Sequence, residues 1–251
     1  MKKLLLIFPL GLLLLSGCVK EEETGALEMT FKANYDGTPL VMLDEYAYDG
    51  GLMMTFQRFN FYIGNVALVD GSTKENLLDI EFVDFDNMAS TEEATAGYSI
   101  LVDEIPTGDY AKIQIGLGVP ADLNATADSD YSGSHPLARA SHYWPGWESF
   151  IFTMINAKVD SNGDGLYDDS SVLYHTGSDE AYRLVEYTFP IRIEKDKVSD
   201  LVFEVDLKAL FQDGAGGYID ILANTNTHNI DDLSIANQVM DNFTQSLKIV
   251  N

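Results

Sequence analysis

The chain has 251 residues, with 15 lysines and arginines against 40 aspartates and glutamates, which gives a formal net charge of −25 at pH 7. So acidic a protein repels nucleic acid and anionic lipid surfaces, which excludes nucleic-acid binding, and it attracts cations. The single cysteine, Cys18, excludes a disulfide or a thiolate metal site within the folded part. The length suits one large sandwich or barrel with a well-buried core.

The N-terminus has the pattern of a secretory signal peptide. Two lysines precede an apolar run over 4–15, and Ser-Gly-Cys follows at 16–18. This run is too short to cross a bilayer, which takes about 20 apolar residues, but it suits a signal peptide. The Leu-Ser-Gly-Cys sequence that ends at Cys18 resembles the bacterial lipobox. We therefore expect a lipoprotein signal peptide at 1–17 and attachment of lipid to Cys18, which anchors the chain on a membrane.

Residues 18–26 are expected to form the lipidated cysteine and an acidic tether. The run Val-Lys-Glu-Glu-Glu at 19–23 is of the kind that is ordinarily solvated. A Lys-Glu-Glu cluster directly after a lipidated cysteine also resembles the surface-export signal of Bacteroidetes lipoproteins. The expected location is therefore the outer membrane, on its periplasmic or cell-surface face.

Residues 27–251 predict one domain built almost entirely of β-strands. Apolar and polar residues alternate over 27–35 and 59–68, which is typical of half-buried strands. A Pro-Thr-Gly turn at 106–108 separates two further runs and predicts a β-hairpin. The other strands are expected at 78–85, 98–105, 110–117, 148–159, 172–175, 182–194 and 201–207.

One amphipathic helix is expected over 231–243. Either Asp231 or Asp232 is placed to cap it. Its apolar residues recur at helical spacing, namely Leu233, Ala236, Val239, Met240 and Phe243. Many short strands separated by turns indicate an all-β fold, an antiparallel β-sandwich of Greek-key type, with this one short C-terminal helix.

The loop after the strand expected at 148–159 matches the start of an EF-hand-type calcium loop. Side-chain oxygens stand at its positions one, three and five, and the glycine at six permits the sharp turn. The glutamate usual at position twelve is replaced by Ser171. The alternative is an Asp-, Asn- and Gly-rich turn without metal. The expected calcium ligands are Asp160, Asn162, Asp164, Leu166, Asp168 and Asp169.

The histidines and tryptophans lie in the most unusual stretches of the chain. Imidazole binds copper and zinc well, and a domain without thiols depends on it for such ions. The alternative for each histidine taken singly is an ordinary hydrogen-bonded residue of the surface or the core. The alternative for the tryptophans is packing in the core or an aromatic platform for sugar. The residues are His135, His142, His175 and His228, with Trp144 and Trp147 directly after His142.

Ordered landmarks over nearly the whole mature domain resemble the MbnP family of copper-binding proteins, named after the protein encoded beside methanobactin genes. The landmarks are the strand over 56–68, the Pro-x-Gly-x-Tyr and Gly-Leu-Gly-Val segments within 105–119, His-Tyr-Trp-Pro-Gly-Trp at 142–147, His-Thr-Gly at 175–177, and His228 before an amphipathic segment that ends at Phe243. The resemblance implies a β-sandwich that binds copper.

The resemblance also implies a candidate copper site. In some relatives two histidines ligate Cu(I), assisted by a tryptophan that a partner dihaem enzyme of the peroxidase type oxidises to kynurenine. Carried over to this chain, Trp144 is the candidate for oxidation and His142 is the nearest ligand candidate. His175 and His228 are candidates for the distant ligand, and His135 completes the candidate copper residues.

Two features depart from the family pattern. His142 stands where the family has an apolar residue before its Tyr-Trp pair. Pro145-Gly146 separates the tryptophans, where the family has a single residue.

We therefore expect an exported, lipid-anchored protein that captures or hands over copper and is not an enzyme. The main alternative is a surface glycan-binding lipoprotein that stacks sugar on Trp144 and Trp147, with calcium as a structural pin. Exposed tryptophans without converging histidines would favour that alternative. A third reading is a glycoside hydrolase, which needs two carboxylates roughly 5–10 Å apart in a cleft.

Overall fold

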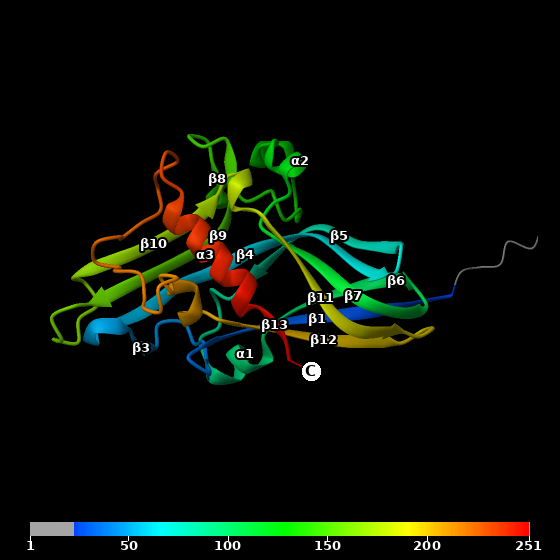
Figure 1. Cartoon of the computed structure of the whole chain (residues 1–251), viewed down its shortest axis with the longest axis horizontal. Coiled ribbons are helices and arrows are strands. Elements are labelled where there is room, and N and C mark those ends of the chain that lie inside the picture. The colour runs from blue at the N-terminus through cyan, green and yellow to red at the C-terminus, as the bar shows by residue number, and fades with distance from the viewer. Residues whose placement is uncertain (1–22, 251) are drawn as a thin grey trace, which may run out of the picture.

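The chain folds into two β-sheets with a short C-terminal helix beside them, as the sequence predicts (Figure 1). This computed structural model describes residues 23–250. The expected signal peptide at 1–17 and the lipidation site Cys18 lie outside the described residues. Within residues 23–250, none of the helices has both the length and the apolar character to span a membrane.

The first sheet has five strands, and four of them run in the order β13-β12-β1-β2, while β6 also pairs with β1. The pairing of β1 with β12 is parallel, and the other pairings in this sheet are antiparallel. This one parallel pair departs from the purely antiparallel sandwich of the sequence prediction. The strands are β1 (Thr24–Tyr35), β2 (Thr38–Pro39), β6 (Tyr98–Pro106), β12 (Val198–Asp206) and β13 (Lys248–Ile249).

The second sheet has eight strands and follows the order β10-β9-β4-β7-β11, with β3 and β5 also paired to β4, and β8 paired to β9. The long strand β4 organises it, because its first half pairs with β9 and its second half with β7 and β5. The strands are β3 (Glu45–Ala47), β4 (Met53–Asp70), β5 (Thr73–Asp84), β7 (Gly108–Leu117), β8 (Tyr143–Trp144), β9 (Ser149–Asp160), β10 (Ser170–Gly177) and β11 (Arg183–Ile193).

The core lies between the two sheets and is rich in phenylalanine. Every second residue of β1 points inward, so that Leu27, Met29 and Phe31 are fully buried. Phe31 stacks on Phe203 of the same sheet at 5.0 Å between ring centroids, and it meets Phe61 of the other sheet edge-on at 6.1 Å. Burial of each such side chain contributes about 1.5–3 kcal/mol, which makes these contacts the main attachment between the sheets.

The hairpin predicted around residues 106–108 does not form. β6 pairs with β1 in the first sheet, whereas β7 pairs with β4 and β11 in the second. The segment is therefore a crossover between sheets, and Thr107 N donates to Glu23 O at 2.9 Å. The prediction was wrong because turn-forming residues specify a change of direction but not the partner of the next strand. By contrast, β9 and β10 do form an antiparallel hairpin around the loop at 161–169.

The predicted C-terminal helix is α3 (Ser234–Ser246). It begins later than expected, and Asp232 contributes to its start by accepting a hydrogen bond from Ser234 N at 3.1 Å. Its apolar face is buried as predicted, and Phe243 meets Phe61 of β4 edge-on at 4.8 Å. The sequence did not predict the short α-helices α1 (Thr91–Ala96) and α2 (Ala121–Asn124), nor the 3-10 turns at Asp49–Gly51, Asp128–Asp130, Ala140–His142, Asp179–Ala181 and Lys208–Phe211.

A short segment ahead of α3 covers the free edge of β10. Leu173 N donates to Thr225 O at 2.8 Å, and Thr227 N donates to Leu173 O at 3.2 Å. The Thr227 hydroxyl accepts from His175 N at 2.8 Å and donates to His175 O at 2.7 Å. Thr227 is only 4% exposed, so these bonds are shielded from water. They satisfy backbone groups that an edge strand would otherwise leave unpaired.

We expect Thr227→Val to lower the free energy of unfolding by about 1–3 kcal/mol, because valine keeps the shape but leaves the buried N–H and C=O of His175 without their partner. Urea denaturation measures this loss. Thr227→Ser retains the hydroxyl and serves as the control, with a smaller expected loss. Equal losses in the two variants would show that the hydroxyl does not hold this segment.

Candidate metal centre

His175 and His228 meet at the edge of the second sheet. His175 lies on β10, and the segment bound to the edge of that strand ends directly before His228. His228 Nε2 lies 3.1 Å from His175 Nδ1, and the ring centroids are 4.6 Å apart. Two histidines that lie 53 residues apart in the sequence thus turn ring nitrogens toward each other.

The two tryptophans form one wall of this centre. Trp144 and Trp147 are the ends of a four-residue turn, closed by a 3.0 Å hydrogen bond from Trp147 N to Trp144 O. Their rings stack face to face at 4.7 Å with an interplanar angle of 4°. The Pro145-Gly146 pair, which departs from the family pattern, supplies the two central residues of this turn. The Trp144 ring lies perpendicular to the His228 ring at 4.6 Å, and 6.3 Å from the His175 ring.

Two residues of β9 beside His175 were missed by the sequence analysis. Met154 lies directly opposite His175 in the strand register and is 4% exposed. Its sulfur lies 3.8 Å from the Arg58 guanidinium. Asn156 comes two residues later, and its Oδ1 lies 2.7 Å from His175 Nε2. The available signal was an amide in the mostly apolar run over 150–157, where a polar side chain needs a specific partner.

His142 is not brought to this pair. Its Nε2 lies 2.8 Å from Asn60 Oδ1 and its Nδ1 lies 3.0 Å from Ser141 Oγ, so both ring nitrogens are engaged. The ring is 4% exposed and packs edge-on against Phe82 at 4.8 Å. These contacts are those of a satisfied buried histidine.

His135 also lies apart from the pair. Its Nδ1 accepts a hydrogen bond from Leu137 N at 3.2 Å, and its ring stacks on Tyr131 at 4.2 Å. Of the predicted copper residues, the structure therefore brings together His175, His228 and Trp144.

Burial keeps the imidazoles of the centre neutral. It lowers the pKa of His175 to about 3, and the neighbouring His228, His142 and Arg58 act in the same direction. Burial also lowers the pKa of His228. Since a metal binds imidazole in its neutral form, both rings are in the binding form at neutral pH.

The donor set of the centre is two imidazole nitrogens beside an indole. Within residues 23–250, no three or more His, Cys, Asp or Glu side chains converge as a metal site. Structural zinc takes four protein ligands almost always, and calcium takes six to eight oxygens, so neither ion suits a pair of imidazoles. Imidazole is a common copper ligand, and the pair fits Cu(I), which accepts few ligands.

The acidic loop at 160–169 is folded around its own side chains. The carboxylate of Asp160 accepts from Gly163 N at 2.7 Å and from Gly165 N at 2.9 Å. The Asn162 amide donates to Asp164 at 3.2 Å and to Asp169 at 3.1 Å. Of the other residues predicted to bind calcium, Leu166 N donates to Asp164 Oδ1 at 2.8 Å, and Asp168 is exposed.

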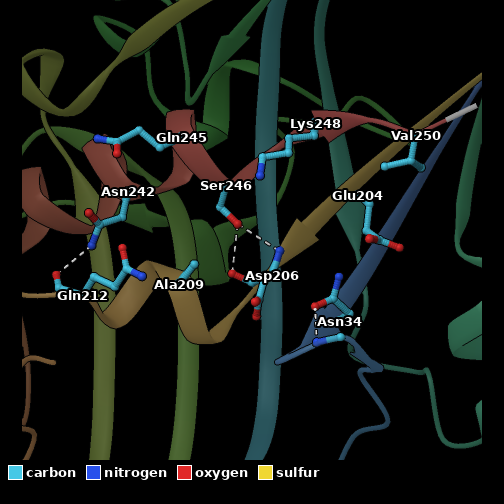
Figure 2. A pocket seen from close by; sticks show the side chains of 11 residues that line it. Asn34, Glu204, Asp206, Ala209, Gln212, Asn242, Gln245, Ser246, Lys248 and Val250 are labelled. Carbon is cyan, nitrogen blue, oxygen red and sulfur yellow. Dashed lines mark hydrogen bonds between the residues drawn. The ribbon is translucent and has the colours of Figure 1, made fainter. Parts of the chain in front are cut away.

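A polar pocket of about 420 Å³ lies elsewhere, at the C-terminal end of α3 (Figure 2). Glu204 and Asp206 both line it, but Asp206 Oδ1 accepts hydrogen bonds from Asp36 N and Lys208 N, each at 3.0 Å. The histidines and tryptophans do not line this pocket, which separates it from the metal centre.

Stability should fall as the pH falls from about 6.5 to about 4, partly because of His142. Burial, with Arg139 and Arg58, lowers the pKa of His142 to about 4. Below about pH 6.5 the unfolded chain binds a proton that the folded chain does not, so each pH unit costs up to about 1.4 kcal/mol. We expect His142→Gln to lose stability less steeply than the wild type when unfolding is measured at pH 7, 6 and 5. Parallel curves would contradict the neutral buried state of His142.

The sequence matches the model of the MbnP family over residues 24–237. Among solved structures, the chain is similar to MbnP from Methylosinus trichosporium, with a TM-score of 0.50 and 16% identity over 80% of this chain and 87% of that chain. An identity this low shows a shared fold alone. A search of curated proteins gives no match. Because the family model covers most of the chain, the protein belongs to the MbnP family.

Proposed function

We propose that this protein binds one copper ion between His175 and His228, for capture or handover rather than catalysis. The observation that carries the proposal is the pair of facing ring nitrogens, 3.1 Å apart, beside the Trp144 ring. Membership of the MbnP family supports it independently of the geometry. Bound copper would supply a soft cation that two neutral imidazoles hold.

The protein contributes a fixed ligand and a tethered one. His175 lies within the regular pairing of β10 with β9, so its backbone position is rigid. His228 follows the edge segment, which Thr227 attaches to β10. Displacement of this segment would separate the ligands, which gives a simple route for release to an acceptor.

Trp144 is the proposed site of oxidation by a dihaem enzyme of the peroxidase type. Its ring lies 4.6 Å from the His228 ring, near enough for a modified side chain to take part in the site. Trp144 is partly exposed, so an outside enzyme has access to its neighbourhood.

The glycan-binding alternative receives less support. A stacking platform needs open aromatic faces, but Trp144 and Trp147 each cover one face of the other. His175 and His228 also converge, which is the arrangement that the copper proposal requires. The carboxylates beside the polar pocket near α3 offer a hydrolase no specific support, because Asp206 is already engaged by two backbone N–H groups.

The proposed location is the outer membrane, through lipid on Cys18. The short stretch between Cys18 and Thr24 would hold the start of β1 within about 20 Å of the anchor, at about 3.5 Å per residue.

We expect His175→Ala and His228→Ala each to lower the affinity for Cu(I) by at least about tenfold, a loss of about 1.4 kcal/mol, because each removes one of two ligands. Competition between the purified protein and a chromogenic Cu(I) chelator measures this, with one ion bound per chain. His135→Ala is the matched control and should bind as the wild type does. Loss of binding in His142→Ala, with no loss in His175→Ala, would move the site to the other histidine.

A structural calcium ion in the loop at 160–169 is the second proposed cofactor. The spacing of its oxygen side chains supports it, as does the buried Asp160, which accepts from Gly165 N at position six. Calcium would require the Asn162 amide to turn its oxygen inward. Since β9 and β10 flank the loop, the ion would brace the strand that carries His175.

We expect 10 mM calcium to stabilise the fold by about 1.5–3 kcal/mol, given dissociation constants of about 10⁻⁴–10⁻³ M for extracellular calcium modules. Thermal unfolding with calcium or with a chelator measures the difference. Asp164→Ala removes a predicted oxygen ligand and should abolish it, whereas Asp103→Ala on β6 makes the same change outside the loop and should preserve it. Equal stability with calcium and with chelator would reject the calcium proposal.

A further inference from the structure

Two histidines, His175 on β10 and His142 in the 3-10 turn before β8, each contact an asparagine. His175 Nε2 lies 2.7 Å from Asn156 Oδ1, and His142 Nε2 lies 2.8 Å from Asn60 Oδ1. All four side chains come from regular strands or from turns packed on them. The two pairs differ in what faces the second ring nitrogen, and this difference decides what each imidazole can do.

In the His142 pair the proton positions follow from the neighbours. Both carboxylate oxygens of Asp86 lie 3.1 Å from Asn60 Nδ2, so the amide nitrogen donates to them and its oxygen faces His142. An amide oxygen only accepts, so His142 carries its proton on Nε2. Its Nδ1 lone pair accepts a hydrogen bond from Ser141 Oγ, 3.0 Å away, so the neighbour at its second ring nitrogen is a hydroxyl and not another imidazole.

In the His175 pair the contact with the asparagine is the same, but the second ring nitrogen has a different neighbour. With Asn156 Oδ1 accepting, His175 carries its proton on Nε2, and the lone pair is on Nδ1. That nitrogen accepts the hydrogen bond from His228 Nε2 at 3.1 Å, so in the copper-free protein His228 carries its proton on Nε2, and copper would take the place of that proton. Were the proton on His175 Nδ1 instead, it would cover the ligand atom of His175 itself.

Asn156 is placed to impose this choice. It lies on β9, two residues from Met154, the residue directly opposite His175, so it is a diagonal neighbour within side-chain reach. Its own register partners are Leu173 on one side and Arg58 on the other. Metal-binding histidines usually donate their second N–H to an oxygen that fixes tautomer and ring orientation.

We propose that Asn156 is a positioning residue of the metal centre: its side-chain oxygen holds the His175 proton on Nε2 and so makes Nδ1 the ligand atom toward His228. This inference rests on the proposed copper function. Loss of such a partner ordinarily lowers metal affinity 10- to 100-fold, and we expect a reduction of about this size here.

The first test is the protonation of the histidine rings in the copper-free protein, read from long-range ¹⁵N–¹H correlation spectra. His142 is the internal reference, since its neighbours fix the proton on Nε2. We expect His175 to show the same pattern in the wild type and to lose it in Asn156→Leu. A wild-type His175 protonated on Nδ1 overturns the proposal without any copper measurement.

The second test is the affinity for Cu(I) of three variants, each checked for folding by circular dichroism and urea denaturation. Asn156→Leu removes the acceptor and should weaken binding 10- to 100-fold, while Asn156→Asp restores an acceptor oxygen and should recover most of the affinity. Asn60→Ala makes the corresponding deletion beneath His142 and should bind as the wild type does.

The outcomes separate the two proposals. If the wild type binds copper and Asn156→Leu binds it equally well, the positioning role is overturned and the copper function stands. If Asn60→Ala weakens binding as much as Asn156→Leu, the effect is general to the sheet, and the positioning role is again overturned. If the wild type binds no copper, the proposed function falls, and the positioning role falls with it.

Discussion

The pair of hydrogen bonds between Thr227 and the backbone of His175 determines what the rest of the centre can be. It joins positions 52 residues apart and fixes the chain on the edge of β10 immediately before His228. Edge strands must cover their free N–H and C=O groups in some way. Here the covering segment also brings in a second imidazole, so one set of hydrogen bonds serves both the sheet edge and the proposed metal centre.

The two histidine–asparagine contacts are alike, and the two imidazoles differ mainly in the group at the second ring nitrogen. His142 is buried and His175 partly buried, and both are neutral at neutral pH and paired with an amide oxygen. At the second ring nitrogen, His142 is hydrogen-bonded to a serine hydroxyl and His175 to another imidazole. The neighbour at that nitrogen therefore decides which of the two histidines could share a metal ion with a second imidazole.

Charge acts at two scales in this protein. The net charge of −25 attracts cations in general and does not distinguish one metal from another. Selection between metals depends on the local ligand atoms, and the candidate centre offers two imidazole nitrogens beside an indole ring, while the Arg58 guanidinium adds positive potential at His175. That potential helps to keep the imidazole unprotonated, which preserves it for a metal.

Much of the fold followed from the sequence alone. Alternation of apolar and polar residues located the strands, because burial on one face of a sheet imposes a period of two, and helical spacing located α3 for the corresponding reason. The sequence also identified the residue types of the centre, since a chain with one cysteine and four histidines has few side chains that bind copper.

The sequence did not determine which strands pair. β6 and β7 belong to different sheets, and β1 and β12 run parallel, because pairing depends on the packing of distant faces. For the same reason, His142, two residues before Trp144 in sequence, faces Asn60. His228, 84 residues after Trp144, meets the tryptophan, because the edge of β10 selects the segment that lies along it. Local sequence thus determined the elements and the available chemistry, and only the tertiary pairing of strand edges decided which side chains share a site.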